Sequence, residues 1–135
     1  MASPEDQLPD IIYQCEMATW HALQHSGEAL IPFLTSDCIM QFPLGMKVTA
    51  VSEPTVRAIL RSPAFLPWKE FDLLDVDVTP VGLDGAVISY MAKATRSGED
   101  PSYDPDVVFE ALCSSVWRIE RGTWKMCFHQ QTLTT

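Results

Sequence analysis

His129 is the residue of this sequence that is best suited to proton transfer near neutral pH. It lies in the segment 123–133, whose aromatic and β-branched residues predict a β-strand. An unperturbed imidazole has a pKa of about 6.5, so it can both accept and release a proton at neutral pH. His129 is therefore a candidate general base or acid, and a hydrogen-bonded structural histidine is the alternative.

Asp37 and Tyr90 are the next candidates for chemistry. Asp37 opens a predicted strand, and a carboxylate beside an apolar pocket has a raised pKa that makes it a usable base. Tyr90 lies in the middle of another predicted strand, from which its hydroxyl could donate a hydrogen bond to a ligand carbonyl. The alternatives are an ordinary turn residue for Asp37 and an internally hydrogen-bonded side chain for Tyr90.

The first predicted helix carries three further residues of interest. Tyr13 and Trp20 lie along its apolar side, either as core residues or as walls of a ligand pocket. Glu16 lies next to this apolar side, where burial of an unpaired carboxylate costs free energy. If Glu16 points inward, it becomes the best alternative acid, paired with His129 or Arg96.

Metal and cofactor sites lack a sequence signature. His21 and His25 are four residues apart on a predicted helix, but no Glu or Cys lies at a supporting spacing. The acidic segment 72–77 is interpreted as a solvated face or a charged strand edge. The sequence contains neither a nucleophile elbow nor a Gly-rich phosphate loop. We therefore expect no metal and no cofactor.

Composition predicts one globular domain spanning residues 1–135, with 47% hydrophobic and 20% charged residues. The net charge of −9 and the scattered basic residues argue against nucleic-acid binding.

The acidic N-terminus is unlike a signal peptide, and no apolar run has the length of a membrane span. The four cysteines form no Cys-x-x-Cys pair and lie in apolar stretches, which is typical of a reducing compartment. We expect a cytoplasmic protein.

Helical patterns precede strand patterns along the chain, so the predicted class is α+β with helices on one face of an antiparallel meander. The acidic, Pro-containing segment 97–105 is interpreted as a mobile hairpin tip or as a lid over a pocket. Predicted helices cover residues 10–26, 28–34 and 52–61, and predicted strands cover residues 37–43, 69–79, 86–96, 107–120 and 123–133.

The segment 111–132, which ends in His-Gln-Gln-Thr, resembles the closing hairpin of the nuclear transport factor 2-like (NTF2-like) superfamily and, within it, of the DUF4440/SnoaL-like group. The segments 20–23, 34–43 and 87–96 agree with that resemblance in order and spacing. The resemblance implies a cone-shaped, curved antiparallel or mixed sheet packed on three N-terminal helices around one pocket. It also implies that Asp37 lies close to the mouth of that pocket.

The resemblance also suggests which side chains face the pocket. Positions matching Ser115 and Gln131 point into the pocket of the kinase association domain that this hairpin resembles. Alternation along the strands then places further side chains with them, unless a bulge reverses the order. The residues expected on the pocket side are Cys113, Ser115, Trp117, Cys127, His129 and Gln131.

Members of the superfamily include isomerases, cyclases, dehydratases and a non-catalytic association domain, so the resemblance leaves catalysis open. The first hypothesis is a cofactor-free proton transfer on a polyketide-, terpenoid- or steroid-like ligand. His129 would be its base or acid, with Asp37 as partner, while Tyr90, Ser115 and Gln131 orient a substrate oxygen. The alternative is a non-catalytic binding or dimerisation module.

A homodimer is expected under either hypothesis. Trp124, Met126 and Phe128 fall on the opposite side of the last strand from His129 when residues simply alternate. Large apolar groups on that side would expose an apolar patch in a monomer. The expected partners are therefore a small hydrophobic ligand and a second copy of the chain.

Overall fold

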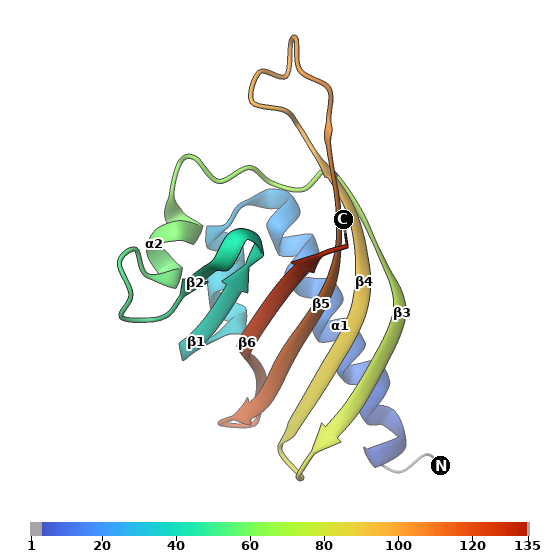
Figure 1. Cartoon of the computed structure of the whole chain (residues 1–135). Coiled ribbons are helices and arrows are strands. Elements are labelled where there is room, and N and C mark those ends of the chain that lie inside the picture. The colour runs from blue at the N-terminus through green and yellow to red at the C-terminus, as the bar shows by residue number, and fades with distance from the viewer. Residues whose placement is uncertain (1–3, 135) are drawn as a thin grey trace.

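The computed structural model describes residues 4–134. Four helical segments and the strand pair β1–β2 precede four long strands (Figure 1). Among the described residues, no helix is long and apolar enough to cross a membrane. The elements are α1 (Pro4–His25), the 3-10 helix η1 (Glu28–Phe33), β1 (Leu34–Phe42), the 3-10 helix η2 (Pro43–Gly45), β2 (Met46–Val48), α2 (Val56–Arg61), β3 (Glu70–Val81), β4 (Gly85–Arg96), β5 (Val107–Glu120) and β6 (Thr123–Leu133).

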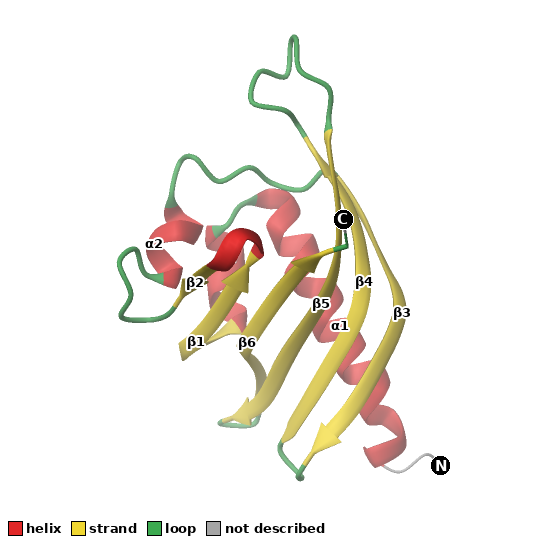
Figure 2. Cartoon of the chain, viewed as in Figure 1, coloured by secondary structure: helices red, strands yellow, loops and turns green. Residues whose placement is uncertain are grey.

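The six strands form one mixed, curved sheet in the order β2-β1-β6-β5-β4-β3. β1 pairs with β6 in parallel, and every other pairing is antiparallel. The helices lie on one face of this sheet, and the loop between β4 and β5 projects beyond its end (Figure 2). The predicted α+β class is confirmed. The parallel β1–β6 pair arises because the last strand returns beside the first.

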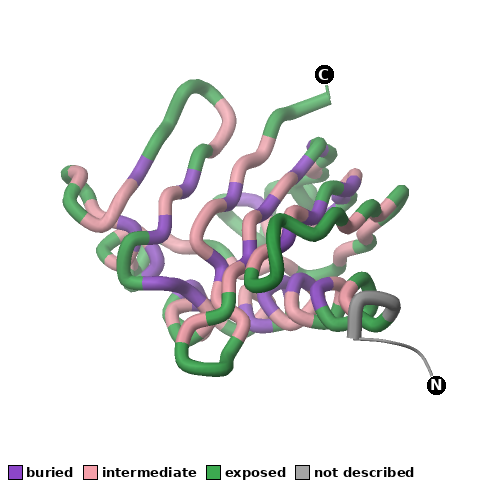
Figure 3. Tube along the Cα trace, turned by 90° about the horizontal axis from the view of Figure 1, so that it is seen from below, coloured by how far each residue is buried: buried purple, intermediate pink, exposed green. Residues whose placement is uncertain are grey.

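Burial alternates along the long strands, as a sheet with one covered face requires (Figure 3). On β4, Ile88, Tyr90 and Ala92 are buried against the helices, whereas Ser89 and Lys93 are exposed. Trp20 on α1 and Trp117 on β5 are among the largest buried side chains of the core between them. The inner face of the sheet is therefore the face that can carry a pocket.

Several predicted boundaries differ from the structure. β1 begins at Leu34 rather than at residue 37, and the short strand β2 had no predicted counterpart. α2 begins at Val56 because the Thr55 side chain accepts a hydrogen bond from the Ala58 N–H at 3.1 Å and acts as the N-cap. The predicted cap, Ser52, instead belongs to the turn that follows β2, where its hydroxyl bonds to the backbone.

A bulge in β6 changes which side chains face inward. Val116 pairs with Phe128 and Trp117 pairs with Met126, so Cys127 is an extra residue on β6. Met126 is therefore buried on the same face as His129, and the expectation that it lies on the outer face is wrong. Trp124 also packs against the core, which leaves Phe128 alone of the three predicted outer residues.

Candidate functional site

A cavity of about 540 Å³ lies between the inner face of the sheet and the helices. Most of its wall is apolar, with Trp20, Met40 and Phe109 as examples. Its polar lining includes Arg96, His129 and Gln131. A largely apolar cavity of this size with a few polar groups is the usual form of a small-molecule site.

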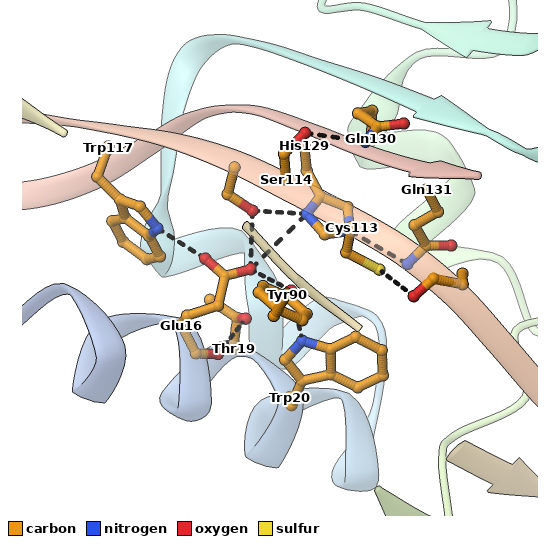
Figure 4. Close-up of polar contacts among 12 residues, drawn as sticks. Glu16, Thr19, Trp20, Tyr90, Cys113, Ser114, Trp117, His129, Gln130 and Gln131 are labelled. Atoms are coloured by element: carbon orange, nitrogen blue, oxygen red, sulfur yellow. Dashed lines mark hydrogen bonds and ion pairs between the residues drawn. The ribbon is translucent and has the colours of Figure 1, made fainter. Parts of the chain in front are cut away.

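Glu16 of α1 lies fully buried beside this cavity and accepts three hydrogen bonds (Figure 4). Trp117 Nε1 donates to Oε1 at 2.7 Å. Tyr90 Oη and Ser115 Oγ donate to Oε2 at 2.5 and 2.7 Å. Burial raises the pKa of Glu16 above its ordinary value, and the three hydrogen bonds oppose that rise. Helix α1 thus holds a carboxyl group with an elevated pKa between itself and the inner face of the sheet, next to the cavity.

His129 is linked to this carboxyl group through Ser115. Its Nδ1 lies 2.7 Å from Ser115 Oγ, and its Nε2 lies 3.1 Å from Gln131 Nε2. Burial lowers the pKa of His129 to about 4, so the ring is neutral near pH 7. Its Nδ1 is 3.8 Å from Glu16 Oε2, but a neutral ring makes this contact no ion pair.

The hydrogen-bond network assigns the tautomer of His129. With Glu16 ionised, Ser115 donates its one hydroxyl hydrogen to the carboxylate, so its oxygen accepts from His129 Nδ1–H. Nε2 then carries a lone pair, which accepts from the Gln131 amide. The imidazole therefore presents a basic nitrogen on the side where both it and Gln131 line the cavity.

Tyr90 is hydrogen-bonded within the protein and is not available to a ligand. Its hydroxyl accepts from Trp20 Nε1 at 2.9 Å and donates to Glu16, so its one hydrogen is already used. Burial and the neighbouring Glu16 carboxylate raise the pKa of Tyr90 well above its ordinary value. Tyr90 therefore supports Glu16, and its hydroxyl does not line the cavity.

Asp37 lies outside the site. Its side chain is 63% exposed on β1 and pairs with Arg118 at 2.9 Å. The nearby Thr35 hydroxyl and the Arg118 guanidinium, which donates a hydrogen bond to it, lower the pKa of Asp37 below its ordinary value. The structure thus corrects the expected position at the cavity mouth, because Asp37 is on the outer side of the strand and does not reach His129.

The remaining expected wall residues divide into three groups. Trp20, His129 and Gln131 line the cavity. Tyr13 is half-buried on α1, and Cys127 leaves the wall because of the β6 bulge. Fully or almost fully buried behind the wall are Cys113, Ser115 and Trp117.

Two contributors to the site were weakly signalled by the sequence. Glu16 was recognisable only as an alternative acid, since its inward direction depends on how α1 packs on β4 and β5. Arg96, the last residue of β4, also lines the cavity. Among residues 7–134, no cluster of three His, Cys, Asp or Glu side chains has the spacing of a metal site.

No protein-family model matches the sequence, and no curated protein matches it. Solved structures do match. An NTF2-like protein from Cytophaga hutchinsonii is 22% identical, with 92% of this chain and 96% of that chain covered and a TM-score of 0.75. A proposed scytalone dehydratase from Novosphingobium aromaticivorans is 13% identical, with 92% and 82% covered and a TM-score of 0.78. The association domain of C. elegans CaMKII is 15% identical, with 95% and 96% covered and a TM-score of 0.69.

The chain has the NTF2-like fold. Identities of 22% or less show the fold alone. Because the matching NTF2-like structures include both a proposed dehydratase and an association domain, the function has to be argued from the site.

Proposed function

We propose that this NTF2-like protein binds a small apolar molecule in the cavity and transfers a proton on it without a cofactor, with His129 as the general base. The observation that carries the proposal is the neutral imidazole of His129, which lines the cavity beside Gln131, the partner of its Nε2, while its Nδ1 is linked through Ser115 to the buried Glu16. A neutral base beside an apolar cavity suits the isomerisation, cyclisation or dehydration of a polyketide-, terpenoid- or steroid-like compound.

The chain Glu16–Ser115–His129 supports a proton relay. When Nε2 takes a proton from a substrate C–H bond, Nδ1 passes its hydrogen to Ser115 Oγ, and Ser115 passes its own to Glu16. The substrate keeps the electron pair as an enolate, and the carboxylate becomes a neutral acid. Burial favours this outcome because it disfavours both an imidazolium at His129 and a carboxylate at Glu16. Gln131 has to turn away from Nε2 to admit the substrate.

A thermal-shift screen tests the proposal. Wild-type protein is mixed with steroids, polyketides and terpenoids that carry a carbonyl group. A ligand present at 100 times its dissociation constant adds about 2.7 kcal/mol, which corresponds to an increase in Tm of roughly 8–12 °C for a domain of this size. We expect one chemical class to shift wild type and the control variant Asp37→Asn equally, because Asp37 lies on the outer surface.

The variant His129→Ala is expected to lose turnover of that class, and its ligand-induced shift is expected to be smaller. If no compound shifts the wild-type protein, the small-molecule function is wrong. If His129→Ala turns the ligand over as wild type does, His129 is not the base.

The second candidate function is an association module, and the outer face of the sheet favours it. Two apolar rows cross this face in register, one from β3 to β5 and one from β4 to β1. Leu112 is 53% exposed in the first row. Apolar rows on an uncovered face fit a second copy of the chain. The rows consist of Leu74, Met91 and Leu112, and of Val87, Val116, Phe128 and Ile39.

We expect the wild-type protein to form a homodimer through this outer face and Leu112→Glu to be a monomer, because a carboxylate in the centre of an apolar interface stays unpaired. Size-exclusion chromatography with light scattering measures both. Gln14→Glu, at an exposed position of α1 on the opposite side of the sheet, adds the same single negative charge and serves as the control. A monomeric wild type contradicts the interface. A dimer that binds no compound of the screen favours the association module.

A further inference from the structure

Arg96 is the cation of the cavity wall. It is the last residue of β4, it pairs with Val107 of β5, and it is half-buried at the side of the cavity. The cavity wall near it is apolar, with Trp68 and Phe109 packed against each other at a centroid distance of 5.1 Å. A guanidinium group in such a place has lost part of its water without gaining polar neighbours.

The guanidinium of Arg96 has no hydrogen-bond or ion-pair partner among residues 7–134. Its Nε is buried and unsatisfied, and its contact is with the Trp68 ring, 5.5 Å from Cζ to the centroid. Elsewhere on the surface Lys69 pairs with Asp106 at 2.9 Å. Other basic residues also lack an acidic partner, but among residues 7–134 Arg96 is the one basic residue with a buried side-chain nitrogen that has no hydrogen-bond partner.

The Trp68 contact orients the guanidinium and leaves its donors free. A cation over an aromatic face is attracted to the ring, but the planar N–H groups remain available at the edge. Those donors form a fork that matches the two oxygens of a carboxylate. A charged group held in this way without a partner costs stability in the free protein, which is the pattern expected of a side chain that is satisfied by a ligand.

We propose that Arg96 binds the carboxylate of an apolar ligand, so that the substrate class of the cavity is a monocarboxylic acid with an apolar body. One guanidinium compensates one negative charge, whereas a phosphate monoester, with close to two charges, would leave one uncompensated among apolar walls. The inference rests on the proposed small-molecule function and narrows it. His129 acts at the reacting end of the molecule, and Arg96 fixes the charged end.

The test compares acids with their uncharged amides. Decanoate, cinnamate and naphthoate are each titrated beside the corresponding primary amide by calorimetry at pH 7.5 and low salt. Wild-type protein is expected to bind at least one acid about 10- to 150-fold more tightly than its amide, the range for hydrogen bonds to a charged group. Arg96→Met is expected to abolish that preference and to leave amide binding unchanged. Arg96→Lys, which keeps the charge without the fork, is expected to restore part of it.

The melting temperature of the free Arg96→Met protein separates a ligand-binding role from a structural one. We expect it to equal or exceed that of wild type, because the substitution removes a buried unsatisfied donor. A clear decrease would mean that the guanidinium serves the fold through Trp68, and it would overturn the proposal. Equal binding of acids and amides by wild type overturns the Arg96 site alone. If the wild-type protein binds neither the acids nor the amides, the result overturns both the Arg96 site and the proposed small-molecule function of the cavity.

Discussion

Replacement of Glu16 by Ala is expected to lower the free energy of unfolding by about 3 kcal/mol. The substitution removes the acceptor of three buried donors, on Trp117, Tyr90 and Ser115. It also leaves a void between α1 and the sheet. Trp117 and Tyr90 are buried and have no other acceptor among residues 7–134 in their hydrogen bonds. Their desolvation is then uncompensated unless water enters.

Urea denaturation followed by circular dichroism measures this loss. Ser115→Ala is the matched comparison, because it keeps the other two donors to Glu16. It removes one donor to Glu16 and the acceptor of His129 Nδ1–H, so we expect a loss of about 2 kcal/mol. Glu16→Gln is expected to fall between the two, since one amide oxygen still accepts. A Glu16→Ala protein as stable as wild type would show that the carboxyl group is not the centre of this network.

The second large effect is a pH dependence that His129 confers on stability. The pKa of His129 is about 4 in the folded protein, against about 6.5 in an unfolded chain. Between these values the unfolded state binds the extra proton, so stability is full above pH 6.5 and falls as the pH falls toward 4. By pH 4.5 the loss relative to pH 7.5 amounts to about 2.5 kcal/mol.

Comparison with a variant isolates this contribution. Glu16 acts in the opposite sense, because its raised pKa stabilises the fold as the pH decreases toward the ordinary carboxyl value. Urea denaturation of wild type and His129→Asn is therefore measured at pH 7.5, 6.5, 5.5 and 4.5. The difference between the two proteins in the pH dependence of the free energy of unfolding is the contribution of His129. We expect the variant to lose about 2.5 kcal/mol less than wild type over that range. Parallel curves would mean that the ring is protonated as easily in the fold as in the unfolded chain.

The same lowered pKa bears on catalysis. A base with a pKa of about 4 is unprotonated throughout the neutral range. For any substrate that the screen identifies, the acid limb of the rate profile is expected well below the pH of about 6.5 at which an ordinary histidine titrates. In the proposed relay, the carboxyl group of Glu16 would offset the weak basicity of the ring by accepting, through Ser115, the proton that the ring passes on.

Much of the fold follows from local patterns in the sequence. The order of helices before strands predicted an α+β domain, and four of the strands were located to within one or two residues. The hairpin 107–133 was predictable because strand alternation and the Arg121-Gly122 turn are local signals. The expected inward direction of Ser115, His129 and Gln131 came from the resemblance to the kinase association domain, which strand alternation extended to neighbouring positions.

Three features depended on tertiary structure. Cys127 enters β6 as an extra residue only because of how β5 and β6 pair, and this brings Met126 to the inner face. Asp37 turns outward because its partner, Arg118, lies on the outer face of β5. Glu16 meets its donors across sequence separations of 74, 99 and 101 residues.

The sequence by itself thus determined the main helices and the five longer strands, their order, and the presence of an imidazole on the last strand, but not the short strand β2. Periodicity reports which side of one element is apolar, because that depends on residues a few positions apart. It carries no information on which side chains of two elements meet, since that depends on packing and register across the whole domain. Only the tertiary structure decided that Glu16, rather than Asp37, is the carboxyl group behind His129.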